Sequence, residues 1–213
     1  MAMETVDPDD LTARARIRDA ALHEFGDKGY DGATIRGIAA RAGVSSGLLR
    51  HHFGSKQELR DACDEYLVKT MRTINEQVRS NVERGDVHYV SARIPIGQYQ
   101  AYITRALVEG SAGQVFDEMV AMTEGWLAAA DQNRTHPPEV DVKSRATVIT
   151  AMALAVPLLQ QHVSRGLGVD VGSPEGDLKM AATLVDVYAN PLLTPEQAKS
   201  AQEDLSRRMG SHS

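Results

Sequence analysis

Apolar residues recur along most of this chain at the spacing of three and four residues that places them on one face of a helix. Glycine, proline and short polar stretches interrupt this pattern, for example at Thr135–Pro138 and Gly166–Pro174. The chain is therefore predicted to be all-α. The predicted helices cover residues 12–28, 34–42, 45–53, 55–84, 96–109, 112–131, 142–165, 175–189 and 194–209.

Two short helices joined by a tight turn are predicted after the first long one. Thr34 is a good N-cap, and Ile38 and Ala39 lie on one face of the helix that follows. Gly43 provides the positive φ that the turn needs, and a serine at position 45 or 46 can cap the second helix. This arrangement is typical of a DNA-binding helix-turn-helix, whose second helix enters the major groove.

A much longer helix is predicted from Ser55 to about Arg84. Ser55 and Glu58 have the spacing of a capping box, in which each side chain caps the other residue's backbone N–H. Apolar residues then continue at helical spacing, and at 1.5 Å per residue the helix would be roughly 45 Å long. Cys63 lies on its apolar face and is interpreted as a core residue.

These residues, at their fixed spacing, resemble the TetR family of bacterial transcription regulators. The matching residues are Ala20, Ala21, Phe25, Gly29, Tyr30, Thr34, Ile38, Ala39, Ala42, Gly43, Val44, Ser45, Gly47, Leu49, His52, Phe53, Ser55 and Lys56. The family usually has a tyrosine in the recognition helix where this chain has Arg50. Arginine can hold a phosphate or read guanine with two hydrogen bonds, so the family's base contacts do not transfer to that position.

The resemblance implies a DNA-binding surface on the two short helices. The residues predicted to contact DNA are Thr34, Arg36, Ser45, Ser46, Gly47, Leu48, Arg50, His51 and Lys56. Thr34 stands where a helix N-terminus can bind a phosphate, and Lys56 is expected to pair with another. In the first helix, Arg14, Arg16 and Arg18 either form a solvated first turn or approach the backbone at the edge of the footprint.

Charge is distributed unevenly along the chain. Residues 11–60 contain nine Lys/Arg against five Asp/Glu, whereas the whole chain has a net charge of −6. A basic head on an acidic body suits a protein that approaches DNA with one end. The single cysteine excludes an internal disulfide and is compatible with the cytoplasm. No apolar run approaches the ~20 residues that span a membrane, so no membrane association is predicted.

The body is predicted to bind a small-molecule effector, because the resembled family has its cavity below the long helix. Tyr99, Tyr102, Met119, Met122 and Trp126 supply adaptable apolar surface, and Gln160 supplies a polar group. Each of these residues is also interpretable as ordinary core or, for Gln160, as a solvated side chain. Spacing alone leaves the choice open.

Residues 142–165 are apolar around nearly the whole helix, which indicates burial on two sides. Pro157 is expected to kink this helix. Together with residues 178–187, it resembles the two-helix face through which members of the family form homodimers. The alternative is that one subunit covers both sides by itself.

The sequence thus predicts a flexible arm (1–10), a helix-turn-helix domain (11–60), a helical effector-binding and dimerisation domain (61–190) and a partly helical tail (191–213). The expected function is that of a homodimeric repressor, released from a palindromic operator in double-stranded DNA by an effector. The alternative is a DNA-binding regulator without a small-molecule effector. No catalytic or metal-binding motif occurs at usable spacing, so neither an enzyme nor a cofactor is predicted.

Overall fold

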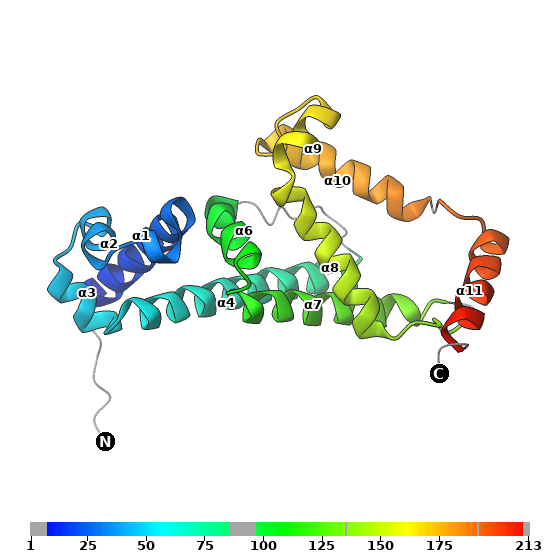
Figure 1. Ribbon diagram of the computed structural model, residues 1–213, viewed down its shortest axis with the longest axis horizontal. Helices are drawn as coiled ribbons and strands as arrows, with labels where there is room; N and C mark the ends of the chain where they lie inside the picture. The colour runs from blue at the N-terminus through cyan, green and yellow to red at the C-terminus, as the bar shows by residue number, and fades with distance from the viewer. Residues whose placement is uncertain (1–7, 86–96, 135, 191, 211–213) are drawn as a thin grey trace, which may run out of the picture. The chain divides into compact units, whose positions relative to one another are not determined.

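A computed structural model describes residues 8–85, 97–134, 136–190 and 192–210. These residues form helices connected by short turns, and none of them lies in a β-strand. The elements are α1 (Pro8–Gly32), α2 (Ile35–Ala42), α3 (Ser46–Phe53), α4 (Lys56–Glu83), η1 (Gly97–Tyr99), α6 (Gln100–Val108), α7 (Gly113–Asp131), α8 (Val142–Leu158), α9 (Gln160–Leu167), α10 (Pro174–Ala189) and α11 (Pro195–Gly210) (Figure 1). The chain divides into two compact units, Met1–Leu159 and Gln160–Ser213.

The first unit begins with a head made of α1, α2, α3 and the start of α4. Its core is apolar and closed: Ile17, Phe25, Ile38, Leu49 and Leu59 are at most 1% exposed. These side chains come from all four helices, so the two short helices are held by the same core as the long ones.

Helix α1 begins four residues before its predicted start. Pro8 lies at its N-terminal end, where the fixed φ of proline fits a first turn and its missing N–H costs nothing. The predicted end is confirmed, because Gly29 has a non-helical φ of 74° and ψ of 169° that interrupts the helix. Residues 1–7 of the predicted arm lie outside the described residues.

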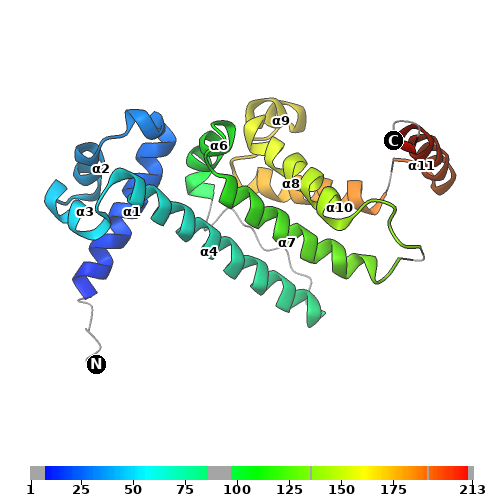
Figure 2. The same ribbon diagram turned by 60° about the horizontal axis from the view of Figure 1, so that its bottom comes forward.

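The body of the first unit is built from α4, α6, α7 and α8. Helix α7 lies beside both α4 and α8 in two views of the molecule (Figure 1, Figure 2). Arg72 on α4 holds Glu118 on α7 with two hydrogen bonds, one of them 2.6 Å long. Arg145 on α8 holds Asp131 at the end of α7 in the same way, at 3.0 and 2.5 Å. Bidentate pairs of this kind fix the orientation of the helices as well as their contact.

Helices α1 and α6 join the head to the body at very close range. The side chain of Arg105 on α6 donates to the backbone oxygen of Gly26 on α1 at 3.0 Å. A Cβ on Gly26 would lie only 2.8 Å from the backbone nitrogen of Tyr102. Glycine is therefore required at this crossing.

The single helix predicted for residues 142–165 is wrong, because the structure has two. Helix α8 ends at Leu158, Leu159 has a φ of −103° and a ψ of 22°, and α9 starts at Gln160. Pro157 accounts for the break, since it cannot donate a backbone hydrogen bond and its ring crowds the preceding turn. The expected kink is thus a complete interruption.

The second unit contains α9, α10 and α11. Ser173 caps α10 by accepting from the backbone N–H of Gly176 at 3.1 Å, and Lys179 on α10 donates to the backbone oxygen of Leu167 at 2.6 Å. No single helix of the described chain is long and apolar enough to cross a membrane; α8 and α9 meet that requirement only when taken together as a bent pair.

Candidate nucleic-acid interface

The helix-turn-helix is formed by α2, α3 and the turn between them, and each boundary has a visible local cause. The side chain of Thr34 accepts from the backbone N–H of Gly37 at 3.0 Å, and that of Ser45 accepts from Leu48 at 3.0 Å. Gly43 ends α2 with a φ of 67°, in the left-handed region that glycine adopts without strain. The N-caps and the turn residue predicted from the sequence are therefore confirmed.

Helix α3 has one face in the core and one face in solvent. Leu49 and Phe53 are buried, at 0% and 6% exposure. Gly47, Arg50 and His51 are exposed. The buried pair fixes the rotation of the helix about its axis, and this rotation directs the exposed residues outward.

The remaining residues predicted for DNA binding are also accessible to different degrees. Thr34, Arg36 and Ser45 are exposed, whereas Ser46 and Leu48 are half-buried. Arg36 and Arg50 form no ion pair within the described part of the chain, so their charge remains available to a phosphate or a base edge.

Other positive charges of the head are already paired with carboxylates. Arg41 on α2 lies 3.0 Å from Asp27 and 3.4 Å from Glu24, and Lys28 lies 2.5 Å from Glu24. Glu24 is buried. The Arg41 contacts fasten α2 to α1 and the Lys28 contact lies within α1, so part of the positive charge counted in the sequence serves the fold.

Lys56, predicted to pair with a phosphate, is largely engaged within the protein. Its ammonium donates to the backbone oxygens of Tyr30 at 2.8 Å and Ala33 at 3.1 Å, and lies 4.3 Å from the centre of the Tyr30 ring. An ammonium has three N–H donors, so one is left for an outside acceptor. Lys56 thereby ties the start of α4 to the turn between α1 and α2.

The start of α4 is fixed by the predicted capping box. The backbone N–H of Ser55 donates to Glu58 at 2.8 Å, and the backbone N–H of Glu58 donates to the Ser55 hydroxyl at 3.1 Å. These bonds to Ser55 lower the pKa of Glu58. The capping box therefore fixes the start of α4 at Lys56, three residues after the end of α3.

The first helix contributes two arginines that fold onto aromatic rings. The guanidinium of Arg14 lies 4.6 Å from the centre of the Phe53 ring, and that of Arg18 lies 3.7 Å from the centre of the Tyr66 ring. Arg16 is exposed. The sequence shows the charges on this helix, but the stacking depends on α3 and α4 and was not predicted.

The residues predicted to bind an effector are placed differently from one another. Tyr99 and Tyr102 are buried, and their hydroxyls donate to Asp19 at 2.8 Å and Asp64 at 2.6 Å. Burial, followed by the bonds to these carboxylates, raises the pKa of both phenols. Both tyrosines thus take part in the contact between α1, α4 and the segment containing α6.

Three of the other four effector candidates lie on α7, and the fourth is Gln160. Met119 and Met122 pack against the core, and the indole of Trp126 donates to Asn75 on α4 at 2.7 Å. Gln160 belongs to the second unit. Met119, Met122 and Trp126 thus share helix α7.

Comparison with known proteins identifies the head. Residues 17–63 match the family model described as bacterial regulatory proteins, tetR family. This matched stretch contains every residue predicted to contact DNA. The chain is also 35% identical over 140 residues to the HTH-type transcriptional regulatory protein RaaS of Mycobacterium tuberculosis, an alignment that covers 64% of this chain and 66% of RaaS. The chain belongs to the TetR family.

Further TetR relatives match over shorter stretches. The HTH-type transcriptional regulator BetI of Cronobacter sakazakii is 42% identical over 116 residues, which are 54% of this chain and 50% of BetI. The chain thus spans between half and just under two thirds of the length of these two relatives. Both are transcriptional regulators by name, in agreement with the predicted regulator.

Solved structures support the fold. A TetR-family regulator from Rhodococcus sp. superimposes with a TM-score of 0.56 at 18% identity, covering 70% of this chain and 87% of that one. A gamma-butyrolactone receptor, described as ArpA-like, superimposes with a TM-score of 0.56 at 23% identity, covering 71% and 81%. The all-α TetR architecture predicted from the sequence is confirmed.

Proposed function

We propose that this TetR-family chain is a sequence-specific DNA-binding transcriptional repressor that acts as a homodimer on a palindromic operator. The observation that carries this proposal is the two-sided helix α3, with Leu49 and Phe53 buried and Arg50 and His51 exposed. Such a helix presents polar side chains to a groove without disturbing its own core.

The recognition helix would lie in the major groove with its first turn closest to the bases. Gly47 allows close approach, and Leu48 can contact a thymine methyl. Arg50 and His51 would contact a base edge or a phosphate. The backbone N–H groups at the start of α2, beside Thr34, suit a phosphate on the flanking strand.

Dimerisation is supported by apolar surface that the single chain leaves exposed. On α8, Val148 and Met152 are 59% and 64% exposed, and on α10, Leu178 and Val185 are 60% and 69% exposed. Apolar side chains exposed in such number normally mark a protein interface. We assign these faces to a second copy of the chain, whose recognition helix would read the other half of the palindrome.

Release from DNA would follow from effector binding to the body. An effector shifts the equilibrium only by the difference between its affinities for the DNA-binding and released states. The candidate contacts remain the six residues predicted from the sequence, of which Tyr99 and Tyr102 are buried and the other four are half-buried.

The proposal is tested by selecting bound sequences from random duplex DNA at near-physiological salt. The purified chain should enrich a palindrome, whereas a double variant Arg50→Ala/His51→Ala, which leaves Leu49 and Phe53 intact, should not. Because phosphate contacts alone give salt-sensitive and sequence-independent binding, competitor DNA must be present. Equal recovery of all sequences by the wild-type chain would refute sequence-specific binding.

A second candidate is a DNA-binding regulator without a small-molecule effector. It is favoured by Tyr99 and Tyr102, whose hydroxyls already bond to Asp19 and Asp64 of the same chain. Thermal unfolding against a panel of metabolites separates the two candidates, because a ligand that binds only the folded state must raise the melting temperature. A compound that raises it and also releases the selected DNA would decide for the effector-controlled repressor.

A further inference from the structure

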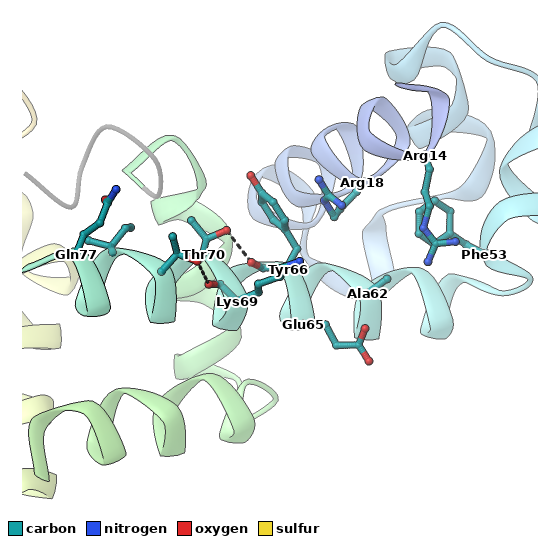
Figure 3. Close-up of a pocket in the computed structure, with 11 residues that line it drawn as sticks. Arg14, Arg18, Phe53, Ala62, Glu65, Tyr66, Lys69, Thr70 and Gln77 are labelled. Atoms are coloured by element: carbon teal, nitrogen blue, oxygen red, sulfur yellow. Dashed lines mark hydrogen bonds between the residues drawn. The ribbon is translucent and has the colours of Figure 1, made fainter. Parts of the chain in front are cut away.

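A groove is lined by residues of α1 and α4, with Phe53 from the end of α3 beside Arg14 (Figure 3). Its volume of about 650 Å³ lies within the range of small-molecule sites. None of the six residues predicted to bind an effector lines it. The groove is therefore separate from the body surface considered above.

Aromatic rings and guanidinium groups form the end of the groove nearest the head. Phe53 and Tyr66 provide the apolar surface, and Arg14 and Arg18 cover these two rings (Figure 3). Arg14 also donates to the backbone oxygen of His52 at 3.1 Å, which fixes its position. An apolar floor and positive charge are thus found within a few ångströms of each other.

The charge of the groove is positive although the chain as a whole is acidic. Arg14, Arg18 and Lys69 line it, against the single carboxylate of Glu65. Neither Arg18 nor Lys69 forms an ion pair within the residues that the structure describes. Arg18 is half-buried beside the Tyr66 ring, so its charge is screened less by water than that of a fully exposed side chain.

The threonines of the α4 wall do not donate hydrogen bonds into the groove. The hydroxyls of Thr70 and Thr73 donate to backbone oxygens of their own helix, at 2.8 and 3.1 Å, so an anion in the groove must be held by the cationic side chains. Ile74 adds apolar surface farther along. From Ala62 to Gln77 the wall is roughly 22 Å long at 1.5 Å per residue, which suits an extended ligand.

We propose that this groove binds an anionic amphiphile, a molecule with one carboxylate or sulfonate and a flat or aliphatic apolar part. The acidic group would lie between Arg18 and Lys69, and the apolar part against Tyr66 and Ile74. This binding does not depend on the proposed DNA-binding function, and the two can be tested separately.

The probe is 8-anilinonaphthalene-1-sulfonate, whose fluorescence rises in apolar surroundings. The double variant Arg18→Gln/Lys69→Gln should weaken its binding about tenfold, because the anion loses two of its partners. Arg16→Gln removes the same charge from the same helix outside the groove and should leave binding unchanged. Glu65→Gln should tighten binding about threefold at an unchanged melting temperature, which separates the gain from the extra probe binding that misfolded protein shows.

Three results would overturn the proposal. The first is no binding of the probe to the wild-type chain below about 1 mM. The second is unchanged binding to the groove double variant while Met152→Glu abolishes it, because the probe then lies on the exposed face of α8. The third is that the groove double variant binds the probe as the wild type does but binds all DNA sequences more weakly. Arg18 and Lys69 would then be contacts to the DNA backbone.

Discussion

At the scale of single residues, identical side chains in the head have different tasks because of what surrounds them. Arg41 and Arg50 are both arginines of the helix-turn-helix. Arg41 is held by Asp27 and Glu24, whereas Arg50 is exposed on α3. Sequence alone indicated that the head is basic, but only the folded neighbours show which charges remain available.

Arg50→Ala is therefore expected to weaken operator binding by about 1–3 kcal/mol with little change in stability. Measurement on the selected operator and on its single-base variants distinguishes two modes of contact. A base contact relaxes the preference at one position, and a phosphate contact weakens all sequences equally and reduces the salt dependence. Arg41→Ala is the matched control, since it should lower the melting temperature and keep the base preference. Full affinity of Arg50→Ala would remove this residue from the interface.

Asp64 gives the stability of the protein a defined dependence on pH. Burial raises the pKa of this carboxyl above its usual value of 3.8, although the hydrogen bond from Tyr102 and the charge of Arg60 oppose the change. The folded protein then binds this proton more tightly than the unfolded chain does. The contribution of Asp64 to stability consequently decreases as the pH rises above the unfolded pKa, and stays lower above the folded pKa.

Asp64→Asn, which keeps an acceptor for the Tyr102 hydroxyl, should therefore be more stable than the wild type at pH 7. The gain should disappear as the pH falls below about 3.8, where the carboxyl is neutral in both states. Urea unfolding at several pH values measures the difference in free energy of unfolding. The control is Asp117→Asn, which removes an exposed carboxylate on α7. A gain that is independent of pH would show that the ionisation of Asp64 is not its cause.

At the scale of elements, helix boundaries were predictable where local chemistry sets them. Thr34, Ser45, Ser55 and Gly43 act within three or four residues, so the sequence contains both partners of each interaction. The break after Pro157 was underestimated, because a kink and a complete interruption have the same local signal. Features made by distant segments, such as the groove between α1 and α4, leave no pattern along the chain.

The crossing of α1 and α6 depends on Gly26. In an open helix, Gly→Ala stabilises by roughly 1 kcal/mol, but here the new methyl group meets the backbone of Tyr102. Gly26→Ala should instead destabilise by about 1–3 kcal/mol, because the two helices must separate. Chemical denaturation measures this difference. Gly166→Ala in α9, where a Cβ meets nothing within 4 Å, serves as the control and should stabilise. Equal effects of the two substitutions would mean that the crossing can widen freely.

At the scale of the whole molecule, the exposed apolar faces of α8 and α10 predict assembly. Val185→Glu should convert the proposed homodimer to a monomer of 23.1 kDa, because a carboxylate would be buried in the interface. Light scattering after gel filtration measures the mass. Val108→Glu on α6 introduces the same charge at a site of equal exposure, 69%, and should leave the dimer intact. A dimer that survives Val185→Glu would exclude this part of α10 from the interface.

Loss of the dimer should also affect the proposed DNA binding. A palindrome bound by two linked recognition helices gains affinity from the connection between them. The Val185→Glu chain is therefore expected to bind a full palindrome no better than a half-site, which a titration with both duplexes would reveal. Retained preference for the palindrome would argue that the heads associate elsewhere.

Helix α3 contains only eight residues, too few to be stable in water without help. Leu49 and Phe53 supply that help from the buried side, so the exposed positions make little contribution to folding. For a repressor of the proposed kind, this separation has an evolutionary consequence. After gene duplication, one copy can acquire a new operator through changes at Gly47, Arg50 or His51 while its fold is preserved, and the other copy keeps the original target.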